Sequence, residues 1–354
     1  MLKVNTKELR EAVRRAKAVI RPGILLMDTC IRFTAKKGKL MLLTNSSGVR
    51  SLNCIACKCG DNVIDFIVNV DLLSGILPFF QSDEITLTLD KKKSLVILEG
   101  GTLRLTLATI TTTAWVNAKR SKEWETEIKI SSEELKTFIN RTSYAAFTKD
   151  TTDIRSTLKI ATTGNGVCVT CLDGYRIALC GDIKGEEDTN FTLPVYLLKI
   201  MSAFLDGTVY LRKRQDQYEI GDRHMIVWGK TPSAGFYNIS QLLSQRPSDC
   251  VRLPKGEFLR LVETAALVNR TRILFTVKNG TVKVSAKGDG GDVENTLEAE
   301  TKVNASYCIN PIYLVDALKK CPDEDVFVYY SKTNITPLYL ESCDHQDIIL
   351  PIQQ

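Results

Sequence analysis

Histidine is scarce in this sequence of 354 residues, which holds only His224 and His345. No motif surrounds either residue, so a Ser/His/Asp or Cys/His catalytic arrangement has little support. The sequence also lacks a phosphate-binding loop of the G-x-x-x-x-G-K-[ST] type and a dinucleotide-binding fingerprint. We therefore predict no catalytic residue and no cofactor; an enzyme that uses the scattered cysteines remains an alternative.

Long apolar runs are missing too. The longest one, residues 68–80, is interrupted by three polar residues and falls short of the ~20 residues that span a bilayer. The first ten residues, MLKVNTKELR, lack the apolar core of a secretory signal. Eleven cysteines, an odd number at irregular spacing, are typical of reduced thiols. These features predict a cytoplasmic protein with no membrane partner.

Three of the cysteines, Cys54, Cys57 and Cys59, stand close enough to suggest zinc. Zinc takes four ligands in a tetrahedral array, and no second cluster completes the set. On a strand, Cys54 and Cys57 would point to opposite faces. We interpret them as small buried residues and predict no metal site.

One pattern of a basic residue, an apolar residue, a cap residue, two variable positions, glutamate and an apolar residue recurs at intervals of about 125 residues. It predicts three helix starts, because Asn or Ser followed by Glu satisfies free backbone amides, and proline presets the first turn. The three copies are residues 3–9, 129–135 and 252–258.

Each copy continues with a predicted hairpin, a second helix and closing strands. The hairpins cover residues 31–43, 158–169 and 273–284; the second helices start near Asn69, Pro194 and Pro311; the closing strands cover 84–110, 207–229 and 325–352. The sequence therefore predicts three domains of one α+β architecture, with boundaries at 1–122, 123–246 and 247–354.

The stretch 171–180, CLDGYRIALC, reads as strand, turn and strand around Asp173-Gly174. Tyr175 and Arg176 follow the glycine, and an aromatic ring beside a guanidinium suits a binding surface. A hairpin that happens to carry an arginine is the alternative. The apolar tail, residues 348–352, must also pack somewhere, either as a buried last strand or as one wall of an apolar groove.

Basic residues recur along the first predicted helix with spacings of three and four, so they share one face. They are Lys7, Arg10, Arg14, Lys17 and Arg21. Glu8 and Glu11 are expected on the other side. Together with the net charge of +6, this stripe is suited to neutralising phosphates without reading bases. An ordinary solvated face is the alternative.

Taken together, these features resemble the bacterial β sliding clamp, the β subunit of DNA polymerase III. The stretch CLDGYRIALC is similar to the family's A-T-D-G-H-R-L-A element, and the three repeats match its three-domain chain. Arg21-Pro22 with Ile24-Leu25 resembles an R-x-x-x-P-I-L element. Leu350-Pro351-Ile352 is similar to the family's M-P-M ending, and Asn310 with Tyr313 to its N-x-x-Y.

The resemblance implies three tandem clamp domains, each with two β-α-β-β-β units, sheets outside and helices inside. Two chains would close head to tail as a ring around duplex DNA, bound without sequence readout. The ring would tether a DNA polymerase and a clamp loader through short peptide motifs, as a processivity factor for DNA replication. A clamp-fold hub that binds peptides without encircling DNA is the alternative.

The resemblance also implies site residues. The basic stripe would face DNA, and Leu105 and Leu107 would meet Leu267 and Val268 of a second chain. The partner-peptide groove would consist of Leu158, Leu172, Gly174, Tyr175, Arg176, Ile177, Leu242, Asn310, Tyr313, Ile335, Pro337, Ile349, Leu350, Pro351 and Ile352.

Overall fold

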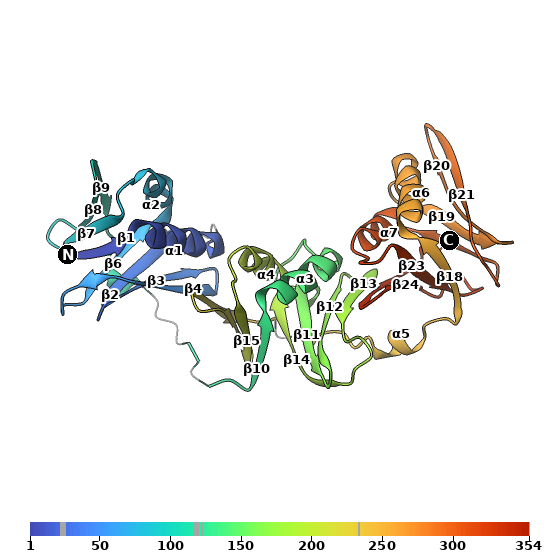
Figure 1. Cartoon of the computed structure of the whole chain (residues 1–354), viewed down its shortest axis with the longest axis horizontal. Helices are drawn as coiled ribbons and strands as arrows, with labels where there is room; N and C mark the ends of the chain where they lie inside the picture. Colours follow the sequence, from blue (N-terminus) through green and yellow to red (C-terminus); the bar gives the residue numbers. More distant parts are fainter. Residues whose placement is uncertain (22–25, 116–119, 122, 233, 354) are drawn as a thin grey trace. The chain divides into compact units, whose positions relative to one another are not determined.

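The computed structural model describes residues 1–21, 26–115, 120–121, 123–232 and 234–353. The chain forms two compact units, Met1–Leu135 with Leu197–Thr231, and Lys136–Tyr196 with Pro232–Gln354. Each unit contains two antiparallel sheets and the helices that cover them (Figure 1). The architecture is α+β, as the sequence predicts. The three domain boundaries stay a prediction; the first falls at Lys122, outside the described residues.

The first unit holds a five-stranded and an eight-stranded sheet. In spatial order the first sheet consists of β5 (Lys58–Cys59), β1 (Leu2–Asn5), β7 (Glu84–Asp90), β8 (Leu95–Gly100) and β9 (Leu103–Ala108). The second consists of β10 (Thr126–Ser131), β15 (Thr208–Arg214), β16 (Gln217–Gly221), β17 (Met225–Lys230), β4 (Val49–Ala56), β3 (Lys39–Ser46), β2 (Cys30–Lys36) and β6 (Ile64–Asn69). The helices α1 (Thr6–Val19) and α2 (Val70–Ile76) pack against each other, and α1 covers β3 and β4.

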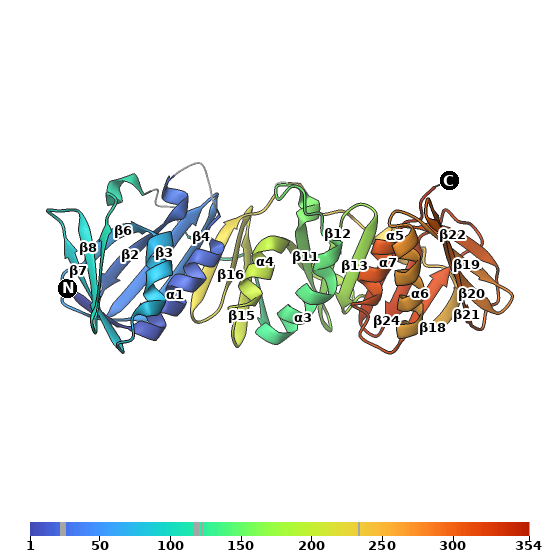
Figure 2. The ribbon, with the colours of Figure 1, turned by 90° about the horizontal axis from the view of Figure 1, so that it is seen from above.

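The second unit holds an eight-stranded and a four-stranded sheet. The larger sheet consists of β14 (Glu187–Pro194), β11 (Thr157–Thr163), β12 (Gly166–Leu172), β13 (Arg176–Gly181), β25 (His345–Ile349), β24 (Leu338–Ser342), β23 (Asp325–Tyr330) and β18 (Asp249–Pro254). The smaller consists of β21 (Gly291–Glu298), β20 (Thr281–Gly288), β19 (Ile273–Lys278) and β22 (Ala305–Ile309). The helices α6 (Lys255–Val268) and α7 (Pro311–Leu318) lie side by side (Figure 2).

The chain has further helices between these elements. They are α3 (Ser132–Thr142), α4 (Val195–Ser202), α5 (Ser240–Ser244), η1 (Leu26–Thr29), η2 (Leu77–Phe79), η3 (Thr112–Ala114), η4 (Ser143–Ala145) and η5 (Ile154–Ser156). No helix in the described part of the chain is both long enough and apolar enough to cross a membrane.

Local sequence signals account for these elements. Asn5 caps α1 by accepting a hydrogen bond from the Glu8 amide at 3.1 Å, and Asn310 caps α7 through the Ile312 amide at 3.0 Å. The β19–β20 turn places Asn279 and Gly280 at φ 49° and 78°, the left-handed values that an Asn-Gly hairpin turn requires. The predicted helix starts, hairpins and closing strands are confirmed in all three repeats.

Two details of the first helix differ from prediction. It ends at Val19, so Arg21 lies beyond it, and the Glu11 carboxylate pairs with Arg14 at 2.8 Å instead of facing away. Residues three positions apart are neighbours on the surface of a helix, so the Glu11 side chain can reach Arg14. Pro22, Ile24 and Leu25 lie outside the described residues.

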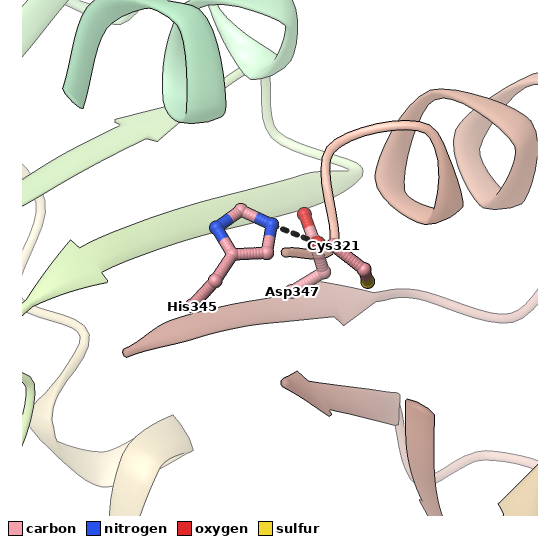
Figure 3. Close-up of side chains that lie close together, drawn as sticks. All are labelled: Cys321, His345 and Asp347. Atoms are coloured by element: carbon pink, nitrogen blue, oxygen red, sulfur yellow. Dashed lines mark hydrogen bonds and ion pairs between the residues drawn. The ribbon is translucent and has the colours of Figure 1, made fainter. Parts of the chain in front are cut away.

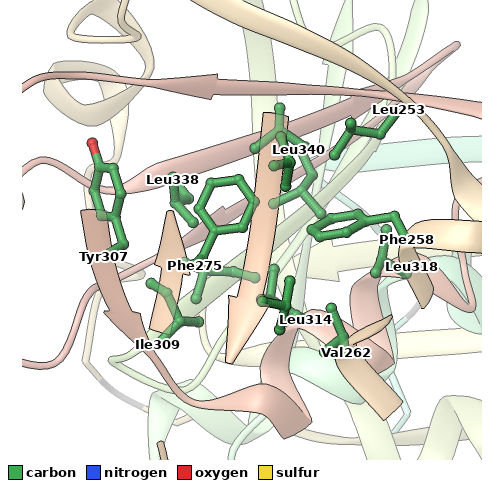
Figure 4. Close-up of a cluster of buried hydrophobic side chains, with 14 of the residues drawn as sticks. Leu253, Phe258, Val262, Phe275, Tyr307, Ile309, Leu314, Leu318, Leu338 and Leu340 are labelled. Carbon is green, nitrogen blue, oxygen red and sulfur yellow. The ribbon is translucent and has the colours of Figure 1, made fainter. Parts of the chain in front are cut away.

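A core of buried apolar side chains holds the last part of the chain together (Figure 4). It gathers α6, α7 and strands of both sheets of the second unit around the tilted ring pair Phe258 and Phe275, whose centroids are 5.8 Å apart. Ile349 of the last strand belongs to this core, so the end of β25 is anchored by burial.

We expect Phe258→Ala to lower the free energy of unfolding by about 3–5 kcal/mol, since it removes a fully buried ring and leaves a cavity. Phe327→Ala is the matched control, because that ring is 41% exposed on the neighbouring β23. Urea unfolding followed by circular dichroism measures both. Equal losses in the two variants would contradict the assigned core.

Candidate functional site

The site is built where strands far apart in sequence join the same sheet. β13 pairs antiparallel with β25, which sets Ile177 opposite Ile348 and Arg176 opposite Ile349. Directly opposed residues on antiparallel strands point to the same face. The pairing therefore brings the hairpin after Asp173 and the C-terminal tail into one surface.

The predicted turn at Asp173-Gly174 is confirmed. The Asp173 carboxylate accepts hydrogen bonds from the Tyr175 and Arg176 amides at 2.9 and 3.1 Å, and Gly174 has a φ of 99°. An aspartate that bonds the backbone two residues on is a typical turn former, and the positive φ favours glycine. The Tyr175 carbonyl then accepts the Leu350 amide at 2.9 Å, so the turn also fixes the tail.

Arg176 is bound from three sides inside this surface. Its guanidinium pairs with Asp173 at 3.0 Å and Asp316 of α7 at 2.6 Å, and it donates to the Tyr144 carbonyl at 2.7 Å. It also lies 4.6 Å from the centre of the Tyr313 ring. Burial alone disfavours the charged guanidinium, but Asp316 and Asp173 outweigh it and raise the pKa of Arg176. Its hydrogen-bonding groups therefore already have partners within the chain.

Beside Arg176 lies an apolar cavity of about 270 Å³. Its walls come from the β12–β13 turn, the segment around α5, β25 and the tail. The lining residues are Arg155, Leu172, Gly174, Tyr175, Arg176, Ile177, Tyr237, Asn238, Ile239, Leu242, Ile348 and Leu350. A concave, largely apolar surface with a few polar groups suits an apolar peptide segment. We call it the groove.

Seven of the residues predicted for this site line the groove: Leu172, Gly174, Tyr175, Arg176, Ile177, Leu242 and Leu350. The other eight do not line it, and several have evident structural roles. Leu158 and Ile349 are buried in the core, Asn310 caps α7, and Tyr313 stacks on Tyr175 at 6.5 Å. Ile335 is 69% exposed and Pro337 is half-buried. Pro351 is half-buried too, and the amide of the next residue, Ile352, donates a hydrogen bond to the Cys308 carbonyl.

The predicted groove residues leave out five that line it: Arg155, Tyr237, Asn238, Ile239 and Ile348. Ile348 follows from strand alternation once Ile349 is known to face the core. Arg155 is set in place by Asp153, which it meets at 2.7 Å, and by the Phe147 ring at 4.4 Å. Neither contact has a signal in the sequence.

The basic stripe of α1 is partly engaged within the chain. Arg10 donates to the carbonyls of Pro78 and Phe80, Arg14 pairs with Glu11, and Lys17 lies 2.7 Å from the Ser74 hydroxyl and 3.4 Å from Asp71. Lys7, Arg14 and Lys17 are exposed at the surface, while Arg10 and Arg21 are half-buried.

The four residues predicted to meet a second chain differ in exposure. Leu105 and Leu107 are 7% and 6% exposed and belong to the core of the first unit, whereas Leu267 is 82% exposed and Val268 is half-buried. Leu105 and Leu107 lie on β9, whereas Leu267 and Val268 end α6, which packs against β21. Both β9 and β21 are edge strands of their sheets. An edge strand has unpaired backbone groups that another chain can pair with.

Comparison with known proteins places this fold among the DNA clamps. No protein-family model matches the chain. A DNA polymerase III β subunit from Pseudomonas aeruginosa superposes with a TM-score of 0.91 over 100% of both chains at 16% identity. The sliding clamp of Bacillus subtilis superposes with a TM-score of 0.88 over 100% of this chain and 99% of that one, at 17% identity.

Within that class, the particular match is to the bacterial β sliding clamp. A curated β sliding clamp from Rickettsia bellii is 22% identical over 100% of both chains. One Pseudomonas aeruginosa clamp with a TM-score of 0.88 is described as bound to griselimycin. The chain has the fold of the β sliding clamps, and the resemblance predicted from its motifs is confirmed.

We expect Arg176→Ala to lower the free energy of unfolding by about 2–3 kcal/mol, because Asp173 and Asp316 lose a charged hydrogen-bond partner. Arg252→Ala is the control: Arg252 pairs with Asp325 but is 67% exposed, so its loss costs less than about 1 kcal/mol. Chemical unfolding compares the two. A smaller loss for Arg176→Ala than for the control would refute the structural role of Arg176.

Proposed function

We propose that this chain is a DNA sliding clamp, which encircles duplex DNA and tethers a polymerase for processive synthesis. The observation that carries the proposal is the groove, which lies in a full-length clamp fold and unites the β12–β13 turn with the C-terminal tail. The role is binding, so no catalytic residue is assigned. The expected location is the cytoplasm.

Two copies would close head to tail as a ring. Leu267 is exposed at the end of α6, beside the half-buried Val268. This supports a contact between the end of α6 in one chain and the edge strand β9 of the second chain. Leu105 and Leu107 largely fill their own core, so their share in that contact would be smaller than the resemblance implies. Contacts between unlike surfaces can close into a ring.

Partners would enter the groove as short linear peptides. Its apolar wall would receive leucine and aromatic side chains, and Asn238 would supply a polar contact at its margin. Arg176 would position the wall rather than bind the peptide, since Asp173, Asp316 and Tyr144 already occupy its guanidinium. Polymerases and clamp loaders are the proposed partners.

Leu350→Asp should weaken binding of a fluorescently labelled Q-L-x-L-F peptide at least tenfold, about 1.4 kcal/mol, because it places a charge in the apolar wall. Leu274→Asp is the matched control, since the two side chains are 38% and 37% exposed and Leu274 lies outside the groove. Fluorescence anisotropy measures both affinities. Undiminished binding by Leu350→Asp would count against the groove as the peptide site.

A peptide-binding hub that does not encircle DNA is the second candidate. The contacts that partly neutralise the stripe of α1, Arg14 with Glu11 and Lys17 with Asp71, favour it. Exposed ion pairs are weak, however, and a phosphate backbone would compete with both carboxylates.

Reversing Lys7, Arg14 and Lys17 to glutamate separates the two candidates. A sliding clamp should then lose stable loading onto DNA and keep its peptide affinity, because these exposed cations would meet phosphates. Reversal of Lys91, Lys92 and Lys93 in the β7–β8 turn changes the net charge equally and serves as the control. If loading survives the first triple change but fails in the second, the α1 stripe is not the surface that contacts DNA.

A further inference from the structure

A second polar cluster lies at the β25 strand, apart from the residues that line the groove. His345 and Asp347 stand two positions apart on β25 and so share one of its faces. Cys321, from the segment after α7, approaches the same face (Figure 3). The thiol sulfur, a ring nitrogen and a carboxylate oxygen all lie within 4.8 Å of one another.

All three side chains are removed from water. His345 and Asp347 are each 1% exposed, and Cys321 is 5% exposed. The His345 Nε2 lies 2.9 Å from Asp347 Oδ2, toward which it turns in Figure 3. Burial of polar and ionisable groups is costly unless each finds a partner. The Nδ1 atom of His345 has no hydrogen-bond partner among the described residues. Burial disfavours the charged ring, but Asp347, with a further effect of the nearby Cys180 thiol, outweighs it and raises the pKa of His345.

The donor set is one that divalent transition metals prefer. Zinc binds thiolate sulfur, imidazole nitrogen and carboxylate oxygen in tetrahedral sites. Among the described residues this is the only group of three such ligands. Cys54, Cys57 and Cys59, the cluster that the sequence suggests, do not form such a group of three. Their interpretation as buried residues is wrong, since Cys54 is exposed and Cys57 and Cys59 are half-buried.

The carboxylate also has support behind it. The Tyr144 hydroxyl donates a hydrogen bond to Asp347 Oδ1 and leaves Oδ2 directed toward His345. Ligating carboxylates are commonly held by such an outer hydrogen bond, which fixes their orientation. The Tyr144 carbonyl in turn accepts from Arg176, so the cluster and the groove share a support.

We infer that Cys321 Sγ, His345 Nε2 and the Asp347 carboxylate form a binding site for a divalent cation of the zinc type. Binding would replace the His345–Asp347 hydrogen bond and release two protons to solvent, the thiol proton of Cys321 and the Nε2 proton of His345, so that a thiolate and a neutral imidazole face the cation. Three protein ligands leave one tetrahedral position for water. The cation would join the end of α7 to β25.

Cobalt substitution tests the site directly. The intact protein is stripped of metal with a chelator, and one equivalent of Co²⁺ is added while the visible and near-ultraviolet spectra are recorded. The expected result is one bound Co²⁺ per chain, with a thiolate-to-cobalt band and the intense visible bands of tetrahedral cobalt. Zn²⁺ should displace the cobalt and abolish both.

Variants locate the ion. Cys321→Ser should remove the thiolate band, and His345→Gln should weaken Zn²⁺ binding at least tenfold in equilibrium dialysis. Tyr144→Phe should weaken it roughly 10–100-fold through the orientation of Asp347. Cys57→Ser is the control and should change nothing. Circular dichroism verifies that each variant is folded.

Two outcomes would overturn the inference. One is an intact, folded protein that binds no stoichiometric Co²⁺ or Zn²⁺. The other is a thiolate band that persists in Cys321→Ser and disappears in Cys57→Ser, which would place the ion at the cysteines of the first unit.

Discussion

The groove depends on the ionic contacts of one arginine whose side chain is only 11% exposed. Arg176 sits at the start of β13, and its guanidinium joins the turn at Asp173 to Asp316 of α7 and to the backbone after α3. The contact links segments that are 140 residues apart in the chain. Its hydrogen bonds are satisfied by two carboxylates and a carbonyl, so the charge is stable where solvent is largely excluded.

Strand pairing then extends this constraint to the tail. Because β13 and β25 are neighbours in one sheet, Ile177 and Ile348 meet on one face, while Ile349 enters the core on the other. The amide of Leu350 is held by the Tyr175 carbonyl, which keeps the apolar tail beside the turn. A terminal segment that would otherwise fray thus becomes a wall of the groove.

Local signals in the sequence were sufficient for the elements and for the turn. The Asn caps and the Asp173-Gly174 and Asn279-Gly280 turns each act within a few residues, so their outcome follows from short-range chemistry. The groove required more, because its far wall around Tyr237 comes from another part of the chain. Of that wall, the predicted groove residues include only Leu242.

The last strand shows why the groove could not be predicted in full. Ile349 was predicted to line it, but Ile348 lines it and Ile349 lies in the core. Which of two adjacent residues faces a groove depends on strand register, and a shift of one position exchanges the faces. The cluster of Cys321, His345 and Asp347 was missed for a similar reason. No pattern in the sequence links its members, and only the packing of the segment after α7 against β25 brings them together.

The most direct test of the central claim is a crystal structure of the chain with a Q-L-x-L-F peptide. We expect the peptide's apolar side chains to lie in the groove between α5 and the β12–β13 turn, in contact with Leu172, Ile177 and Ile348, while Arg176 keeps its contacts with Asp173 and Asp316. A peptide seated elsewhere on the chain, or one that draws Arg176 away from both carboxylates, would contradict it.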